Sequence, residues 1–188
     1  MTTPISICQG ALTRMGEAPL SSFTDGSAAA LIAQANYEMV KAAVLALYPW
    51  RCAMETKRLN KLTALPFHPW EAAWQRPADA IKVWNVREPG NGRAVEFDQQ
   101  GKKILTLAAD DLIVDYGFNC DEAFLEPHVV EMVTLKMAAV FATGIADRAS
   151  MAGGFVAEFE AYFARAKSAD SQGRTPQAIQ ASRWTSAR

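Results

Sequence analysis

The side chains best suited to metal chemistry lie near residue 130. His128 is one of two histidines in the chain, and Glu126 and Glu131 lie close to it in sequence. A histidine and a glutamate three positions apart share one face of a helix and can bind a metal ion together. The sequence offers no second pair of this kind for a two-metal site. Acidic residues at a helix start also complement the helix dipole. We favour this second interpretation, so neither a metal ion nor a cofactor is expected.

Sequence motifs of catalysis are missing. The chain contains no nucleophile-elbow pattern, no phosphate-binding lysine loop and no dinucleotide-binding glycine pattern. The glycines at 90 and 92 mark a turn, without the helix that a phosphate loop needs after it. The other histidine, His68, lies in a proline-rich segment and is expected to pack there. Triads built from distant residues stay open, but the chain is predicted not to be an enzyme.

The composition indicates a folded protein whose net charge produces no strong electrostatic field. The chain has 188 residues, 50% of them apolar and 21% charged, with a net charge of −1. This length suits one domain, or one domain with an inserted subdomain. A net charge near zero attracts neither nucleic acid nor an acidic membrane surface. No signal peptide or membrane-spanning segment is apparent, so no membrane partner is expected.

The three cysteines, Cys8, Cys52 and Cys120, are far apart in sequence. An odd number at these spacings gives neither a disulfide framework nor a zinc ligand set. We therefore expect buried free thiols in a reducing cytoplasm.

The N-terminal region predicts helices. A first helix is expected over 3–15, ended by Gly16. A second should begin near Asp25, which can cap it, and run to about Tyr48 before Pro49. Its apolar residues form two stripes that together cover more than half of its surface, so we expect it to be central in a bundle. The stripes are Ala28, Ile32, Ala35, Met39 and Ala42, and Tyr37, Val40, Val44 and Leu47. Residues 51–62 are expected to continue as a shorter helix.

Strand signals appear in the middle of the chain and helix signals return after it. Short strands are predicted at 81–86, 94–97, 104–107 and 112–116. A helix should start at Glu126–Pro127, and a last one, capped by Asp147, should run to about Ala169.

The predicted fold class is mainly α. A helical bundle over 1–64 and 121–170 would carry a small inserted antiparallel β-sheet over 65–120 and an extended C-terminal tail over 171–188. The expected core of the bundle includes Ile32, Met39, Val44, Val133, Val140 and Phe141.

The tail is basic and contains one tryptophan. It cannot fold alone on its apolar content, yet it carries residue types that are enriched at binding hot spots. These candidate partner-binding residues are Arg174, Arg183, Trp184 and Arg188. The alternative is a disordered tail with a chance tryptophan.

The N-terminal half resembles phage head–tail adaptor (connector) proteins, the head completion group that includes tail tubular protein A. The likeness rests on an ordered series: a first helix ending at Gly16, the turn Asp25-Gly26-Ser27, a long helix, and Pro49-Trp50. A second series is similar to the entry and exit of the family's β-insert. It consists of Trp74, Pro77 and Asp79, and later Asp115 with Tyr116. The likeness extends to about Asp170.

The resemblance implies a non-enzymatic structural protein of the virion neck, assembled in the cytoplasm of a host bacterium. Such proteins form a ring, typically dodecameric, that joins the capsid portal to the tail or to a stopper protein. The implied partners are the portal protein, the tail or stopper protein and copies of the same chain. Packaged DNA would pass through without specific binding. The alternative is a helical nucleic-acid-binding packaging protein, such as a small terminase subunit, but that class calls for a concentrated basic helix.

One charged segment fits this setting. Between residues 110 and 131 there are seven acidic residues and no lysine or arginine. We expect part of it, with Asp110, Asp111 and Asp115 as candidates, to face the channel or a neighbouring subunit. Carboxylates along a channel would keep DNA from sticking, because phosphate binding needs lysine or arginine. A solvated loop and helix start is the alternative.

Overall fold

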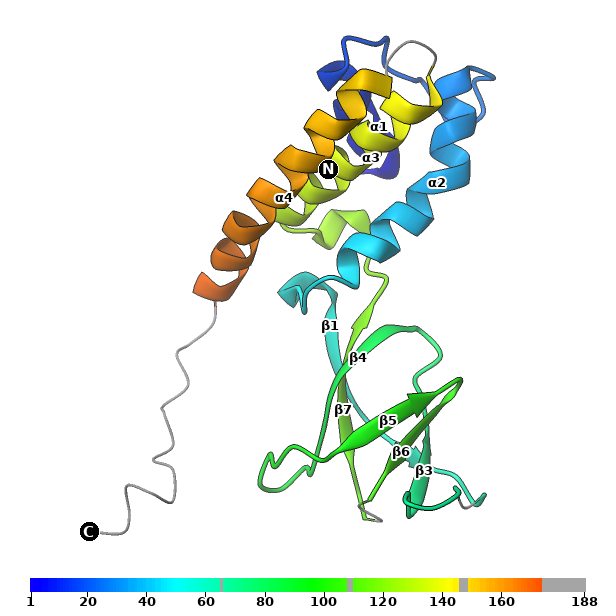
Figure 1. Ribbon diagram of the computed structural model, residues 1–188, viewed down its shortest axis with the longest axis vertical. Coiled ribbons are helices and arrows are strands. Elements are labelled where there is room, and N and C mark those ends of the chain that lie inside the picture. The colour runs from blue at the N-terminus through cyan, green and yellow to red at the C-terminus, as the bar shows by residue number, and fades with distance from the viewer. Residues whose placement is uncertain (65, 108–109, 146–148, 174–188) are drawn as a thin grey trace, which may run out of the picture.

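A computed structural model describes all residues except 65, 108–109, 146–148 and 174–188. The described chain has two parts, a helical body and a β-subdomain that projects from one end of it (Figure 1). The predicted cap Asp147 and the four predicted partner-binding residues of the tail lie outside the described residues.

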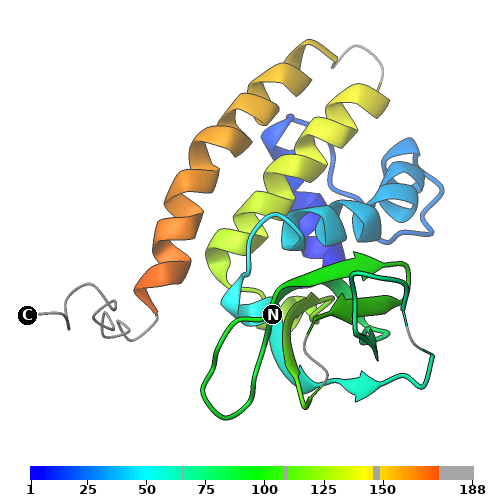
Figure 2. The ribbon, with the colours of Figure 1, turned by 60° about the horizontal axis from the view of Figure 1, so that its bottom comes forward.

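The helical body is built on α3, Pro127–Gly144, which contacts α1, Pro4–Arg14, α2, Ala28–Leu45, and α4, Ala149–Gln172. Helix α2 lies on one side of α3 and α4 on the other (Figures 1 and 2). Helix α4 ends at Gln172, three residues beyond its expected end at Ala169, and so includes the first two residues of the predicted tail. Two short 3₁₀ turns complete the body, at Arg51–Ala53 and Glu122–Phe124.

Local capping explains where the first two helices begin. Thr3 caps α1 and forms a reciprocal capping box with Ser6, and Gly16, at φ 73°, follows the end of the helix. Ser27 caps α2 by accepting from the backbone N–H of Ala30 at 3.1 Å. The prediction that Asp25 caps this helix is wrong. Its carboxylate instead accepts from the N–H and hydroxyl of Ser27 and so orders the turn before the helix.

The described residues of the β-subdomain form seven antiparallel strands in two sheets. The first sheet has the order β1-β7-β4, formed by Met54–Arg58, Ile113–Phe118 and Ala80–Arg87. The second has the order β2-β3-β6-β5, formed by Asn60–Lys61, Ala72–Gln75, Lys103–Thr106 and Phe97–Gln100. The two sheets share one core, in which Trp74 and Ile104 of the second sheet meet Val83 and Val114 of the first.

The predicted fold class, a mainly α bundle with a small sheet, is wrong. Helices hold 46% of the described residues and strands 20%, so the described part of the chain is an α+β mixture with four helices and two sheets. Residues 51–62 caused most of the error. They were expected to be helical, but after one 3₁₀ turn they form β1 and β2. Pairing with β7, from Met54 opposite Gly117 to Arg58 opposite Ile113, overrides the helix propensity of this segment.

The predicted core is right in part. Val44, Val133 and Phe141 are buried, whereas Ile32 and Val140 are only half-buried. Met39 is 65% exposed, so its assignment to the core is wrong. Helix α2 packs on α3 with its other stripe, and this contact turns Met39 outward.

No helix among the described residues is both long enough and apolar enough to cross a membrane.

Two methionines test this packing because they are the same residue in opposite environments. Met132 of α3 is fully buried, and Met39 of α2 is exposed. We expect Met132→Ala to lower the free energy of unfolding by about 2–5 kcal/mol, through lost burial and the cavity left behind. Met39→Ala should change it by no more than about 0.5 kcal/mol. Urea unfolding of the monomer measures both. Equal losses in the two variants would contradict the packing of α2 on α3.

Candidate assembly surfaces

One face of α2 is apolar and uncovered. Leu31, Ala35 and Met39 follow one another at spacing of four and are all exposed, Leu31 to 60% and Met39 to 65%. We call these three residues the α2 ridge. Ala35 and Met39 belong, with exposed Ala28, to the stripe expected to be core, whereas Ile32 and Ala42 of that stripe are half-buried. Leu31 was not part of that stripe and extends the exposed face by one turn. No other described element covers the ridge. Large exposed apolar residues in a row on one helix are typical of contact surfaces.

The opposite side of the helical body carries a different surface. On α4 a row of exposed small residues runs along the outward face at spacing of three and four. It consists of Gly153, Ala157, Ala161, Ala164 and Ser168. We call this row the α4 small-residue face. Helices α2 and α4 lie on opposite sides of α3 in both views (Figures 1 and 2). The body therefore presents a protruding apolar surface on one side and a shallow one on the other.

A buried ion pair joins α2 to the segment that returns from the β-subdomain. Lys41 Nζ lies 2.6 Å from Glu122 Oε1, and both residues are at least nine-tenths buried. The hydroxyl of Tyr37 donates to the same carboxylate oxygen at 3.1 Å. Burial, followed by the nearby Glu122 carboxylate, raises the pKa of Tyr37, so this hydroxyl stays a donor. The network fixes the point at which the chain re-enters the helical body.

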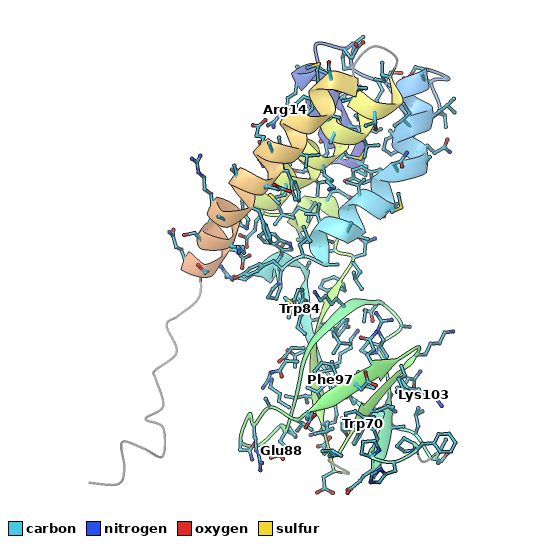
Figure 3. All side chains as sticks on the ribbon, viewed as in Figure 1. Arg14, Trp70, Trp84, Glu88, Phe97 and Lys103 are labelled. Atoms are coloured by element: carbon cyan, nitrogen blue, oxygen red, sulfur yellow. The ribbon has the colours of Figure 1, made fainter. Side chains whose placement is uncertain are left out.

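The β-subdomain is attached to the end of α2 by a second contact. Lys82 of β4 donates to the carbonyl of Ala46 at 3.1 Å, and its ammonium lies 4.0 Å from the centroid of the Trp84 ring. Trp84 lies where the two parts of the molecule meet (Figure 3). A cation held over an aromatic ring stabilises by about 0.5–2 kcal/mol, depending on exposure. This contact restrains the first sheet against the body.

A second polar group lies where the start of α3 meets the end of α4. His128 Nε2 is 3.6 Å from Glu126 Oε2 and 3.6 Å from Asp170 Oδ1. Asp170 is fully buried and accepts from the backbone N–H of Arg51 at 3.0 Å. The structure thus brings His128 together with Glu126, as the sequence suggested, but not with Glu131. Glu131 instead accepts from Arg14 of α1 at 2.7 Å.

The cysteines are free thiols, as expected. Cys8 and Cys120 are buried and Cys52 is half-buried. Burial raises the pKa of Cys8 to about 12. Cys52 and Cys120 are hydrogen-bonded to each other, and this contact together with burial raises the pKa of Cys120. Two of the three thiols are thus neighbours, which their spacing in sequence did not suggest.

The acidic segment is mostly engaged within the molecule. Asp110 is exposed, and Asp111 pairs with Arg58 at 2.8 Å. Asp115 accepts from the guanidinium of Arg87 at 2.8 Å and from the hydroxyl of Thr56 at 2.6 Å. Of the three candidate channel residues, Asp110 and Asp111 are therefore the more exposed, and Asp115 links the three strands of the first sheet.

The other four acids of the segment each have a local role. Asp121 caps the second 3₁₀ turn, Glu122 is buried with Lys41, Glu126 lies by His128 and Glu131 pairs with Arg14. Sequence reasoning missed the buried partners Lys41 and Asp170. Lys41 gave a weak signal, because it interrupts the apolar stripes of α2 next to Val40. Nothing near Asp170 in sequence indicates its burial.

No family model matches the chain, and no curated protein is significantly similar to it in sequence.

Asp115 provides a test of the sheet network that depends on pH. Burial raises the pKa of Asp115, but hydrogen bonds from Arg87 and Thr56 outweigh this effect, so that pKa lies below its usual value. A carboxylate of this kind stabilises the fold above its unfolded-state pKa, about 3.9, and the contribution is lost as pH falls through the folded value.

We expect Asp115→Asn to reduce the free energy of unfolding by about 1–2 kcal/mol near pH 7. The difference from the parent chain should shrink near pH 3 and below, and urea unfolding at both pH values measures it. Asp110→Asn, at an exposed carboxylate, is the control and should have little effect. A loss in Asp115→Asn that is the same at both pH values would contradict the network.

Proposed function

We propose that the chain is a structural head-to-tail adaptor, which forms a ring between the capsid portal and the tail or stopper of a bacteriophage. The proposal starts from the ordered resemblance of the sequence to adaptor proteins. The observation that supports it most strongly is the α2 ridge. The sequence of α2 is patterned for burial on two sides, and the described fold buries only one.

A ring needs two different surfaces on opposite sides of each subunit. Head-to-tail contacts use one patch on one copy and a complementary patch on the next, and they close into a ring when the rotation allows. The α2 ridge and the α4 small-residue face meet this requirement. Leu31 and Met39 protrude, and the glycine and alanines of α4 leave room for them. We therefore propose that α2 of one subunit packs against α4 of its neighbour.

The far end of the β-subdomain offers another contact. Trp70 lies at the end away from the helical body (Figure 3), and Phe67, whose carbonyl accepts from the N–H of Trp70, is 94% exposed. An exposed aromatic residue at a projecting tip is suited to a protein neighbour. We assign this tip to the adjoining neck protein. A ring with the helical bodies at one level and the β-subdomains at another would thus present separate surfaces along its axis.

The alternative class, a packaging protein that binds nucleic acid, gains no specific support from the described residues. Lys57 and Arg58 form the basic run of β1. Lys57 pairs with Glu55 and Asp79, and Arg58 pairs with Asp111. A surface that binds phosphate would leave such cations available.

The ring contact predicts the effect of a charge on the ridge. Met39→Glu should prevent ring formation on the portal, because it places an unpaired carboxylate in the apolar contact. The monomer should melt at an unchanged temperature, since Met39 is exposed. Gln34→Glu is the matched control, because it adds the same charge at an exposed polar position of the same helix. Light scattering with size exclusion and negative-stain microscopy, with the portal protein of the same genome, measure assembly. Met39→Glu rings that form as readily as those of Gln34→Glu would exclude the α2 ridge as the contact.

The basic tail is expected to make the attachment to the portal. Deleting 174–188 leaves all four described helices intact, so the melting temperature should stay within about 2 °C. Binding to the portal should be lost, because Arg174, Arg183, Trp184 and Arg188 are removed together. Co-sedimentation of parent and truncated chains with portal measures this loss. If the truncated chain binds with unchanged affinity, the docking surface lies in the folded body instead.

A further inference from the structure

We propose that Glu126, His128 and Asp170 form a zinc-binding site that ties the end of α4 to the start of α3. The proposal rests on these three side chains and does not depend on ring assembly. The sequence interpretation favoured a solvated helix start for His128 and Glu126. The structure adds Asp170, 42 positions after His128 in the sequence, as the third member of the group.

The distances fit a single small cation. One ligand atom from each residue lies within 4.8 Å of the other two, and His128 Nε2 is 3.6 Å from an oxygen of each carboxylate. Zinc binds nitrogen and oxygen at about 2.0–2.2 Å, so ligand atoms of a tetrahedral site are separated by about 3.4 Å. The separations of His128 Nε2 from Glu126 Oε2 and from Asp170 Oδ1 already lie close to this value. Small side-chain rotations would complete the triangle.

Two buried atoms of the group have no hydrogen-bond partner among the described residues. Asp170 is fully buried, and its Oδ2 has no hydrogen-bond donor among the described residues. His128 is 8% exposed, and its Nε2 forms no hydrogen bond to a described residue, since the carboxylate oxygens nearest to it are 3.6 Å away. Buried polar atoms normally have partners, and a buried carboxylate without one is costly. Asp170 Oδ1, the oxygen 3.6 Å from His128 Nε2, already accepts from the N–H of Arg51, so Oδ2 is the oxygen left for a metal ion. A metal ion bound by Asp170 Oδ2 and His128 Nε2 would supply the partner that each atom lacks.

The ligand types select the metal. Imidazole nitrogen with two carboxylates suits zinc, whereas calcium and magnesium prefer oxygen ligands alone. Glu126 has 35% of its side chain exposed, so the fourth position of a tetrahedral site opens to solvent on its side. Cys52 is close by, with a hydrogen bond to the backbone of Glu126, but its thiol is engaged with Cys120. We therefore assign a site with three protein ligands, nitrogen and oxygen only, and a water molecule.

The position of the site gives it a structural role. Asp170 lies in the last turn of α4, and Glu126 and His128 lie at the start of α3. Asp170 also holds the backbone of Arg51, where the chain leaves for β1. Bound zinc would fix three separate segments at one point.

Titration of the full, tag-free chain with zinc tests the site, using isothermal calorimetry and thermal melting. We expect one zinc ion per chain and a higher melting temperature in its presence. His128→Gln and Asp170→Asn should each weaken binding by at least about 100-fold, because loss of outer-shell partners alone weakens binding about 10- to 100-fold. His68→Gln removes the other histidine, which is exposed, and should leave binding unchanged.

A second measurement guards against variants that do not fold. Cobalt bound to the parent chain should give visible absorption of tetrahedral strength, without a thiolate charge-transfer band, and zinc should displace it. Asp170→Asn keeps an oxygen that can accept from the Arg51 N–H, so its far-ultraviolet circular dichroism should match that of the parent chain. The proposal is overturned if the parent chain binds no zinc, if binding survives His128→Gln, or if a thiolate band appears.

Discussion

The pair of opposite charges buried between Lys41 and Glu122 is the constraint on which the rest of the structure depends. Removing two charges from water is expensive unless each meets the other in good geometry, and here the contact is 2.6 Å with Tyr37 as a further donor. Lys41 belongs to the helix before the β-subdomain and Glu122 to the segment after it. The pair requires the chain to return from the β-subdomain to the side of α2 that it left. It therefore links the packing of α2 to the position at which the β-subdomain joins the body.

Much of the fold could be predicted from local pattern. The helices at α1, α2 and α3 and the strands β4, β6 and β7 follow from periodicity, glycine stops and β-branched residues. Segment Met54–Arg58 could not be predicted in this way, because its glutamate, lysine and arginine favour helix and three of its five residues are exposed. The short strand Ala72–Gln75 was missed as well, because it begins with two alanines, which favour helix over strand. In both cases pairing with a distant strand decides the conformation.

The candidate surfaces were visible in sequence to different degrees. The two apolar stripes of α2 could be identified from the sequence, but periodicity does not determine which stripe packs on α3 and which is exposed to solvent. The cluster at His128 needed Asp170, and only the antiparallel return of α4 along α3 brings that carboxylate within reach. Glu131, the nearer choice in sequence, is taken by Arg14 at 2.7 Å. The sequence pattern therefore failed to predict contacts between residues that are far apart in the chain.

The pairing of β1 with β7 has an evolutionary consequence. Met54 lies opposite Gly117, so the chain enters and leaves the β-subdomain at adjacent positions. A segment whose two ends meet can be lengthened, shortened or exchanged for another without moving its host. Selection can thus act on the projecting strands and the helical body separately. Related genomes are expected to show the greatest divergence between these two positions, and chimaeras joined there should retain the helical body.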